Sequence, residues 1–286
     1  MEMKIPFGKP IIDDDEKLAV QEVLSGPILV HGPKSQQFEN AFGEFTSAPH
    51  AISVSSCTAG MHLIYHALGF GPGDEVIVPS QTHVATAHAV ELTGARPVFV
   101  DANIDSGNMD VSALESLITP RTKAIAVVHL GGWPADMPAI CDLARAHGIA
   151  VIEDCAQAHG ARINGQFVGS FGDVAAWSFC QDKILTTAGE GGMVSTSCPD
   201  LWDKMWAFKD HGKTYEAVFE RDHPSGYRWL HERFGSNFRL TELQSAIGRQ
   251  QLQRLPEWTA ARTRNALLLA DALADCAAVR VPLPAE

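Results

Sequence analysis

The sequence between residues 124 and 154 decides the fold class. It begins with Ala124-Ile-Ala-Val-Val-His129, continues through the amphipathic segment 137–147, and ends with Ala150-Val-Ile-Glu-Asp154. The two short apolar runs are typical of strands that are buried on both faces. Because a helical segment lies between them, they predict parallel strands joined by a right-handed crossover.

The same alternation extends toward the N-terminus. Glu75-Val-Ile-Val-Pro79 and Pro97-Val-Phe-Val-Asp101 predict two further strands, and residues 85–92 predict a helix between them. The sequence therefore predicts the α/β class, with a mostly parallel sheet flanked by helices. Ligands of such open sheets bind beyond the carboxyl ends of the strands. We expect the site residues just after the apolar runs.

Composition and charge narrow the range of partners. The 286 residues are 45% hydrophobic and 20% charged, which is ordinary for a globular protein. A formal net charge of −12 argues against nucleic acid or an anionic membrane as the main partner. The first residues lack the pattern of a secretory signal, and no apolar stretch approaches the ~20 residues of a membrane helix. We expect a cytoplasmic protein.

The cysteines predict neither a metal site nor a disulfide framework. All six are scattered along the chain, and none forms a Cys-x-x-Cys pair. Buried, reduced thiols are the expectation for a cytoplasmic protein.

The composition changes near residue 207. Residues 208–237 are rich in charged side chains without a clear period, which predicts long loops of the kind that often carry function. One helical pattern runs from Leu240 to Leu255, and a second runs from Trp258 to about Cys276. Residues 279–286 resemble the first strand of a further subdomain. We predict a large domain, 1–240, and the helical start of an incomplete small domain, 241–286.

One lysine lies ahead of a glycine-rich run, in Ser178-Phe-Cys-Gln-Asp-Lys183-Ile-Leu-Thr-Thr-Ala-Gly-Glu-Gly-Gly192. Imine chemistry needs such an amine beside small residues that let a flat ring approach. The hydroxyls of Ser178, Thr186 and Thr187 suit a phosphate group. The alternative is an ordinary surface lysine before a glycine turn.

An acidic residue ends the strand 150–154. The Asp154 carboxylate can pair there with a protonated pyridine nitrogen and deepen the electron sink of a cofactor. An equally good alternative is that Asp154 caps a following helix. Gln157 and His159 come next, and we expect His159 to be a hydrogen-bonded structural residue.

Two further segments suit a ring that carries a phosphate. The small residues before Thr58 and Ala59 lead into a helix whose free amides can bind an anion, although such starts also occur as simple caps. His83 follows the strand 75–79 and can stack on a ring, although a lone histidine is more often structural. The pattern of a nucleoside-triphosphate P-loop is missing from the sequence.

Taken in order, these segments resemble the sugar aminotransferases of the DegT/DnrJ/EryC1/StrS family. The resemblance covers nearly the whole chain and rests on residues 71–80, 134–137, 153–161, 178–192 and 235–242. It implies the fold of aspartate aminotransferase and pyridoxal 5'-phosphate as the cofactor. Lys183 matches the lysine that holds the cofactor as a Schiff base, Asp154 matches the partner of the pyridine nitrogen, and Gln157 matches the residue beside the ring hydroxyl.

The remaining site residues follow from the same resemblance. Thr58, Ala59 and Ser178 match phosphate-binding positions. Asn237 matches an asparagine that reaches the phosphate of the neighbouring subunit's cofactor, which implies a homodimer with shared active sites. His83 stands where the family usually has an aromatic residue against the ring. Members of the family usually continue well beyond the length of this chain.

The resemblance implies transfer of an amino group. The donor is an amino acid, glutamate by resemblance, and the acceptor is a keto group of a nucleotide-linked deoxysugar. Lysines and arginines of the loops 209–233 are candidates for binding the diphosphate, with solvated surface charge as the alternative. Two other functions remain open. One is a cofactor-dependent sugar dehydratase or isomerase on the same scaffold, although the dehydratases of this family carry histidine in place of the lysine. The other is a truncated, non-catalytic relative that binds a ligand or partner without turnover.

Overall fold

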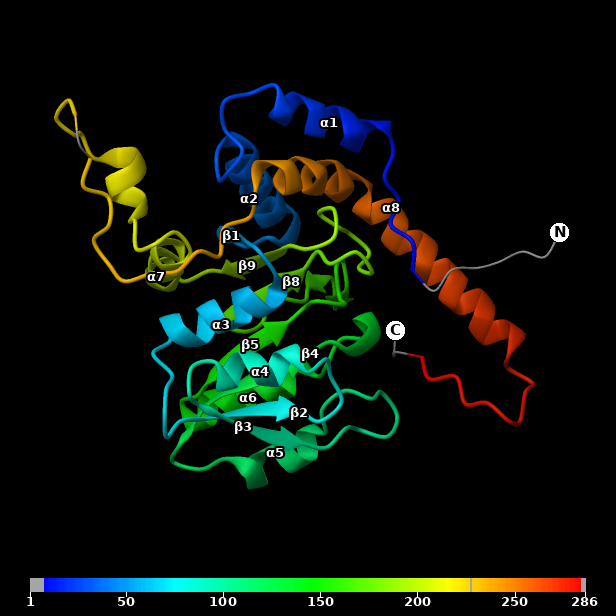
Figure 1. The fold of residues 1–286 in the computed structure, drawn as a ribbon. Helices are drawn as coiled ribbons and strands as arrows, with labels where there is room; N and C mark the ends of the chain where they lie inside the picture. Colours follow the sequence, from blue (N-terminus) through cyan, green and yellow to red (C-terminus); the bar gives the residue numbers. More distant parts are fainter. Residues whose placement is uncertain (1–7, 227, 284–286) are drawn as a thin grey trace.

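The computed structural model describes residues 8–226 and 228–283. Its centre is a seven-stranded sheet with the order β1-β9-β8-β5-β4-β2-β3 (Figure 1). β9 runs antiparallel to β1 and β8, and the other neighbouring strands are parallel. The strands of the sheet are β1 (His50–Val54), β2 (Glu75–Pro79), β3 (Arg96–Val100), β4 (Thr122–Val128), β5 (Ala150–Asp154), β8 (Val174–Ser178) and β9 (Gly192–Thr196). A small hairpin, β6 (Arg162–Ile163) and β7 (Gln166–Phe167), stands apart from it. The predicted α/β class with a mostly parallel sheet is confirmed.

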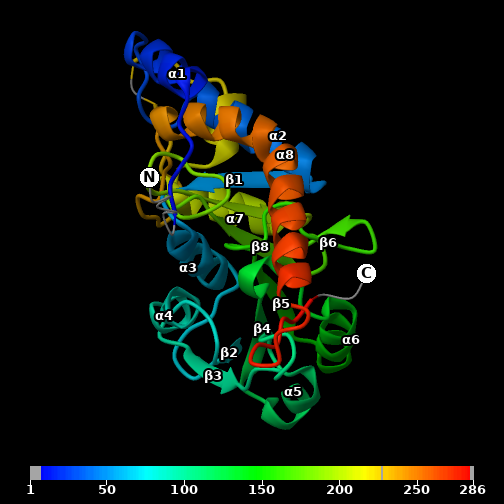
Figure 2. The ribbon, with the colours of Figure 1, turned by 90° about the vertical axis from the view of Figure 1, so that its right-hand side faces the viewer.

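Helices cover both faces of this sheet (Figures 1 and 2). One face packs against α3 (Cys57–Ala67), α4 (Ala85–Glu91) and α7 (Pro199–Lys209). The other packs against α2 (Pro33–Thr46), α5 (Val111–Leu117), α6 (Met137–His147) and α8 (Glu242–Ala272). α1 (Asp14–Leu24) lies on α8. The short helices η1 (Leu130–Gly132) and η2 (Glu216–Glu220) complete the described elements.

Alternating side chains of the strands pack into separate cores on the two faces of the sheet. On β4, Ala124 and Ala126 face the helices α3 and α4, whereas Ile125 and Val127 face α5 and α6. Burial on both faces explains why these strands appear in the sequence as continuous apolar runs. The carboxyl ends of the parallel strands therefore meet at one edge of the sheet.

The C-terminal third differs from prediction in two places. The two helices expected on either side of Pro256 are one helix, α8. Pro256 lacks an amide donor, but Leu252 and Leu255 are buried beside it and hold the first half of the helix on α2. Residues 277–283 form no strand; instead Arg280 binds Asp105. Residues 284–286 of the expected strand lie outside the described residues.

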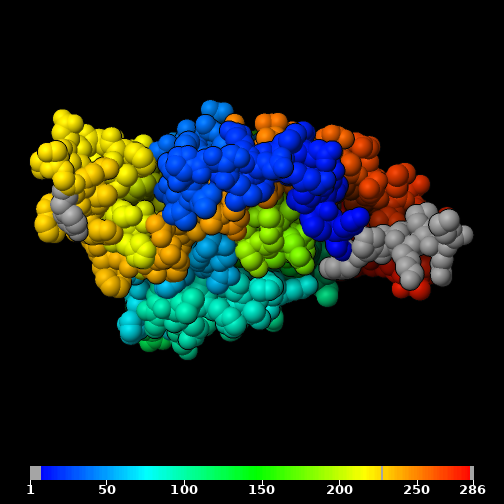
Figure 3. All heavy atoms as spheres, turned by 45° about the horizontal axis from the view of Figure 1, so that its top comes forward, coloured from blue at the N-terminus to red at the C-terminus, as the bar shows by residue number. Residues whose placement is uncertain are grey.

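Residues 210–237 are mostly irregular, as predicted, apart from the π-helical η2. Figure 3 shows that the segment after α7 projects from one side of the molecule. Among the described residues, no helix has the length and apolarity needed to cross a membrane. All six cysteines are free thiols. Cys155 is buried, Cys57, Cys141 and Cys180 are half-buried, and the expectation of buried thiols is wrong for the exposed Cys198 and Cys276.

Leu252 and Leu255 of α8 belong to the same core as Phe38 and Phe42 of α2. Beyond Ala261 the side chains of α8 are mostly exposed. The domain boundary at residue 240 stays a prediction.

Candidate active site

The candidate residues follow strands that end at one edge of the sheet. Asp154 ends β5, Ser178 ends β8, and Cys57 begins α3 directly after β1. Contacts confirm that they converge, because Cys57 Sγ lies 3.9 Å from Asp154 Oδ1. Lys183 is near enough that its charge acts on the pKa of Asp154. The structure thus brings together the lysine, the acid and a helix start that lies 97 residues before the acid in the sequence.

Asp154 is buried and firmly oriented. Thr86 on α4 donates a hydrogen bond of 2.9 Å to Oδ2, and the Ala156 amide donates one of 3.1 Å to Oδ1. Burial raises the pKa of Asp154, while the Ala156 and Thr86 donors and the charge of Lys183 oppose this rise. The helix-cap alternative is wrong, because a turn follows Asp154 and leads to the hairpin β6–β7.

Lys183 lies in the turn region between β8 and β9. Its side chain is only 18% exposed, and Nζ lies 3.2 Å from Asp182 Oδ2. The alternative of an ordinary surface lysine does not describe a side chain that is mostly covered. Ala188, with φ +67°, and Gly189, with φ +121°, turn the chain back toward β9.

Two of the three hydroxyls near Lys183 that were expected to suit a phosphate already have hydrogen-bond partners. Thr186 donates to the Phe179 carbonyl at 3.1 Å, and Thr187 donates to the Glu190 carbonyl at 2.7 Å. Both threonines are buried, so they shape the turn and are not available to a phosphate. Ser178 accepts from the Cys180 amide at 3.3 Å and can still donate its own proton.

The start of α3 offers a smaller anion site than the sequence suggested. Ser56 caps the helix by accepting a hydrogen bond from the Ala59 amide at 3.1 Å. For Ala59 the alternative of an ordinary helix cap is therefore correct, because its amide is not free to bind an anion. The amides of Cys57 and Thr58, and the Thr58 hydroxyl, bind nothing within the described part of the chain. They are suitable donors for an anion at a helix N-terminus. Gly192 of β9 lies against this start.

His83 and Gln157 are at the margin of this edge. His83 is exposed, and its Nδ1 accepts from the Ala85 amide at 3.2 Å at the beginning of α4. Its role against a ring stays a prediction. Gln157 accepts from the Gly131 amide through Oε1 at 2.6 Å.

His159 is a buried structural residue, as expected, but neither ring nitrogen forms a hydrogen bond of good geometry among the described residues. Its ring packs between Trp177 and Phe179. Burial, assisted by the charge of Lys183, lowers the pKa of His159 to about 3, so the ring is neutral.

Asn237 lies beside the end of β1, because the neighbouring Phe238 carbonyl accepts from the Ser55 amide at 2.8 Å. Its Oδ1 accepts from Arg239 at 3.0 Å. No contact joins Asn237 to Lys183 or Asp154 in the described chain. Its role toward a second subunit stays a prediction.

The cations expected to bind a diphosphate are largely engaged. Lys209 is completely buried, with Nζ 3.1 Å from Glu39 Oε1 and 3.1 Å from His31 Nε2. It therefore cannot reach a substrate. Arginines 221 and 233 form ion pairs with acidic side chains of the same chain.

Sequence reasoning missed a pocket next to Lys183. It has a volume of about 280 Å³, and its lining includes three cations and no carboxylate. Two of the cations, Lys9 and Arg262, had no sequence signal because they belong to an irregular segment and an ordinary helix surface. The lining residues are Lys9, Pro10, Ile11, Lys183, Ile184, Thr186, Gln251, Trp258, Ala261, Arg262 and Asn265.

Asp154 lies at a strand end of a mostly parallel sheet, and Lys183 lies in the turn after the neighbouring strand. Together they define an aminotransferase-type site. The chain belongs to the DegT/DnrJ/EryC1/StrS aminotransferase family, whose model matches residues 10–286. The family and the names of the relatives indicate a nucleotide-sugar aminotransferase.

Curated relatives support this assignment. A GDP-perosamine synthase of Escherichia coli O157:H7 is 41% identical over 255 residues, which are 89% of this chain and 67% of that protein. A GDP-perosamine synthase of Caulobacter vibrioides is 43% identical over 262 residues, 91% of this chain and 68% of that protein. The chain thus spans about two thirds of the length of these relatives.

The fold of the chain is similar to the folds of solved aminotransferase structures. The aminotransferase from Psychrobacter cryohalolentis is 48% identical with a TM-score of 0.94, over 96% of this chain and 71% of that one. The putative sugar aminotransferase Spr1654 from Streptococcus pneumoniae, in its PLP form, is 28% identical with a TM-score of 0.86, over 96% and 72%. The expected family and fold are confirmed.

Proposed function

We propose that this chain binds pyridoxal 5'-phosphate on Lys183 and transfers an amino group from an amino acid, glutamate by family resemblance, to a keto group of a nucleotide-linked deoxysugar. The observation that carries the proposal is the convergence of a mostly covered lysine, a buried aspartate and unused helix-start donors at one edge of the sheet. When bound, the cofactor supplies the electron sink on which the substrate carbon is deprotonated.

The residues of the chain divide the remaining work. The Asp154 carboxylate, held by Thr86, is suited to keep the ring nitrogen protonated. The Lys183 amine, once released, is suited to carry the proton between the substrate carbon and the cofactor carbon. Thr58 and Ser178 are available to the phosphate, whereas the Ala59 amide is already used by the cap.

The pocket beside Lys183 supports an anionic substrate. Its cationic lining contrasts with the net charge of −12 on the whole chain. Carboxylates and phosphates are the groups that an arginine binds best. The pocket therefore suits the carboxylate of the donor or the diphosphate of the acceptor.

Cofactor uptake is the first test. The purified chain with added pyridoxal 5'-phosphate should show a visible absorbance band that borohydride removes, and K183A should not. A chain that never acquires the band would exclude the catalytic function and leave the non-catalytic relative. With 15N-glutamate and a keto-sugar nucleotide, an aminotransferase leaves the labelled nitrogen on the sugar product, whereas a dehydratase gives a sugar without it.

A homodimer with shared sites is tested by mixing two inactive variants. K183A and N237A each damage every site of their own dimer. If Asn237 serves the neighbouring subunit, a mixed dimer has one site with both defects and one with neither. Activity should then return on mixing, and two variants that stay inactive together would contradict the shared site. A cytoplasmic location stays a prediction, to be checked by fractionating cells.

A further inference from the structure

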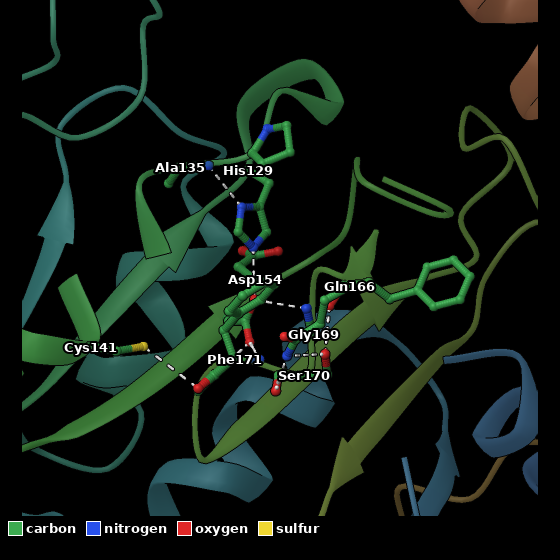
Figure 4. A network of polar contacts seen from close by, with 12 residues as sticks. His129, Ala135, Cys141, Asp154, Gln166, Gly169, Ser170 and Phe171 are labelled. Atoms are coloured by element: carbon green, nitrogen blue, oxygen red, sulfur yellow. Dashed lines mark hydrogen bonds and ion pairs between the residues drawn. The ribbon is translucent and has the colours of Figure 1, made fainter. Parts of the chain in front are cut away.

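A buried histidine joins the ends of β4 and β5 (Figure 4). His129 follows β4, and its Nδ1 accepts from the Ala135 amide at 3.1 Å. Since Nδ1 is an acceptor, the ring proton of neutral His129 lies on Nε2. That nitrogen lies 3.0 Å from Glu153 Oε2, to which it donates. The hydrogen bonds therefore define both the tautomer and the orientation of the ring.

Glu153 anchors the other side of this contact. It precedes Asp154 on β5, so the two side chains point to opposite faces of the sheet. Its carboxylate also accepts from the amides of Gly169, Phe171 and Gly172 at 2.7 to 2.8 Å. Burial alone would raise the pKa of Glu153, but His129 and these amides hold it below its usual value.

The same place could be taken for a metal site. The donor atoms of His129, Glu153 and Cys155 lie within 4.8 Å of one another. Both nitrogens of His129 and both carboxylate oxygens already have partners, however. A metal would have to displace several buried hydrogen bonds. The cluster is therefore a positioning network.

The loop that His129 holds forms a hydrogen bond with Gln157. The ring closes the loop 130–135 back onto the end of β4, and Asn108 secures it further by accepting from the Leu130 amide at 3.0 Å. Within this loop the Gly131 amide donates to Gln157 Oε1 at 2.6 Å. This bond fixes which end of the Gln157 side-chain amide faces the loop, and Nε2 has no hydrogen-bond partner among the described residues.

We propose that His129 is a positioning residue for the ring oxygen of the cofactor: by holding the loop 130–135, it orients Gln157 so that Nε2 donates to that oxygen. This inference rests on the proposed function. A donor at the ring oxygen would stabilise the negative charge that this oxygen carries after it loses its proton. Loss of the donor leaves that proton more tightly held and moves its titration to higher pH.

The test is a double-mutant cycle of H129N, Q157A and the two combined. The readouts are the pH midpoint of the visible absorbance of the cofactor-loaded protein and the dissociation constant of the cofactor. We expect Q157A to raise the midpoint by about one pH unit, the size of one hydrogen bond to a charged group. H129N should raise it by at least about half as much. The combined variant should match Q157A, because both changes remove the same donor.

Two further variants complete the design. H147Q removes a histidine from the surface end of α6 and should leave the midpoint unchanged. N108A loosens the same loop without touching Glu153 and should raise the midpoint, which keeps the test decisive if H129N does not fold. An unchanged midpoint in H129N or N108A, or additive shifts in the combined variant, would overturn the proposal. If the wild-type protein never acquires the band, the proposed function itself fails.

Discussion

Replacement of Gly192 by alanine tests whether the start of α3 is a rigid seat for the cofactor phosphate. A Cβ at Gly192 would lie 2.6 Å from the Ser56 carbonyl carbon, 2.7 Å from the Cys57 nitrogen and 2.8 Å from the Ser56 oxygen. All three atoms are backbone, so no side chain can rotate away. Ordinary contact begins at 3.4 Å. The start of α3 must therefore move by roughly 0.8 Å, the difference between 3.4 and 2.6 Å.

The expected cost follows from this displacement. Overpacking of this kind costs about 1–3 kcal/mol of the free energy of unfolding. The shift also misplaces the amides of Cys57 and Thr58, and we expect about tenfold weaker cofactor binding, which corresponds to about 1.4 kcal/mol. Urea unfolding of the cofactor-free protein measures the first quantity, and titration of the visible band measures the second.

G71A is the matched control. The nearest atom to a Cβ at Gly71 is the Thr93 carbonyl oxygen at 3.9 Å, which is ordinary contact. G71A should keep wild-type cofactor affinity and unfold close to the wild-type urea midpoint. A G192A protein that matches G71A in both measurements would refute a rigid phosphate seat at the start of α3.

Four further changes have defined outcomes. D154N removes the charge that faces the ring nitrogen and should lower turnover by at least about 100-fold with little change in fold, as judged by circular dichroism. The pKa of Glu75 is held at about 2 by hydrogen bonds from Thr119, Arg96 and Arg121, below its usual 4.5. Its stabilisation is therefore complete above the usual pKa and is lost as the pH falls toward 2, so E75Q should weaken the acid dependence of the urea midpoint. K209M leaves Glu39 buried without its cation and should cost about 3–5 kcal/mol of unfolding free energy; an unchanged midpoint would contradict the buried pair. R262A should raise the KM of the donor if the pocket binds the donor carboxylate, or the KM of the acceptor if it binds the acceptor diphosphate. R264A, on the same helix, should change neither KM. If R262A also changes neither KM, the pocket is not an anion site.

The sequence predicted the parts of this protein that depend on local pattern. Continuous apolar runs indicated strands buried on both faces, and their alternation with helical segments indicated a mostly parallel sheet. Because the carboxyl ends of such strands meet at one edge, Asp154 could be assigned to the site before any contact was known, and the family resemblance added Lys183. The family resemblance then named the chemistry.

Tertiary contacts decided the residues whose roles depend on distant partners. Thr186 and Thr187 offered hydroxyls in the sequence, but the turn uses both. Lys209 lies in a charged segment and seemed available to a substrate. In the structure it is buried, because it pairs with Glu39, which lies 170 residues earlier in the sequence. The His159 ring is buried without a hydrogen bond of good geometry among the described residues.

The Gln157 orientation is the same kind of result. It depends on Gly131, whose loop is held by His129 and Asn108, and no spacing in the sequence joins these residues. Periodicity reports the burial of a segment, which is a local property. A hydrogen bond requires that two particular atoms meet, and only the packed chain brings them together.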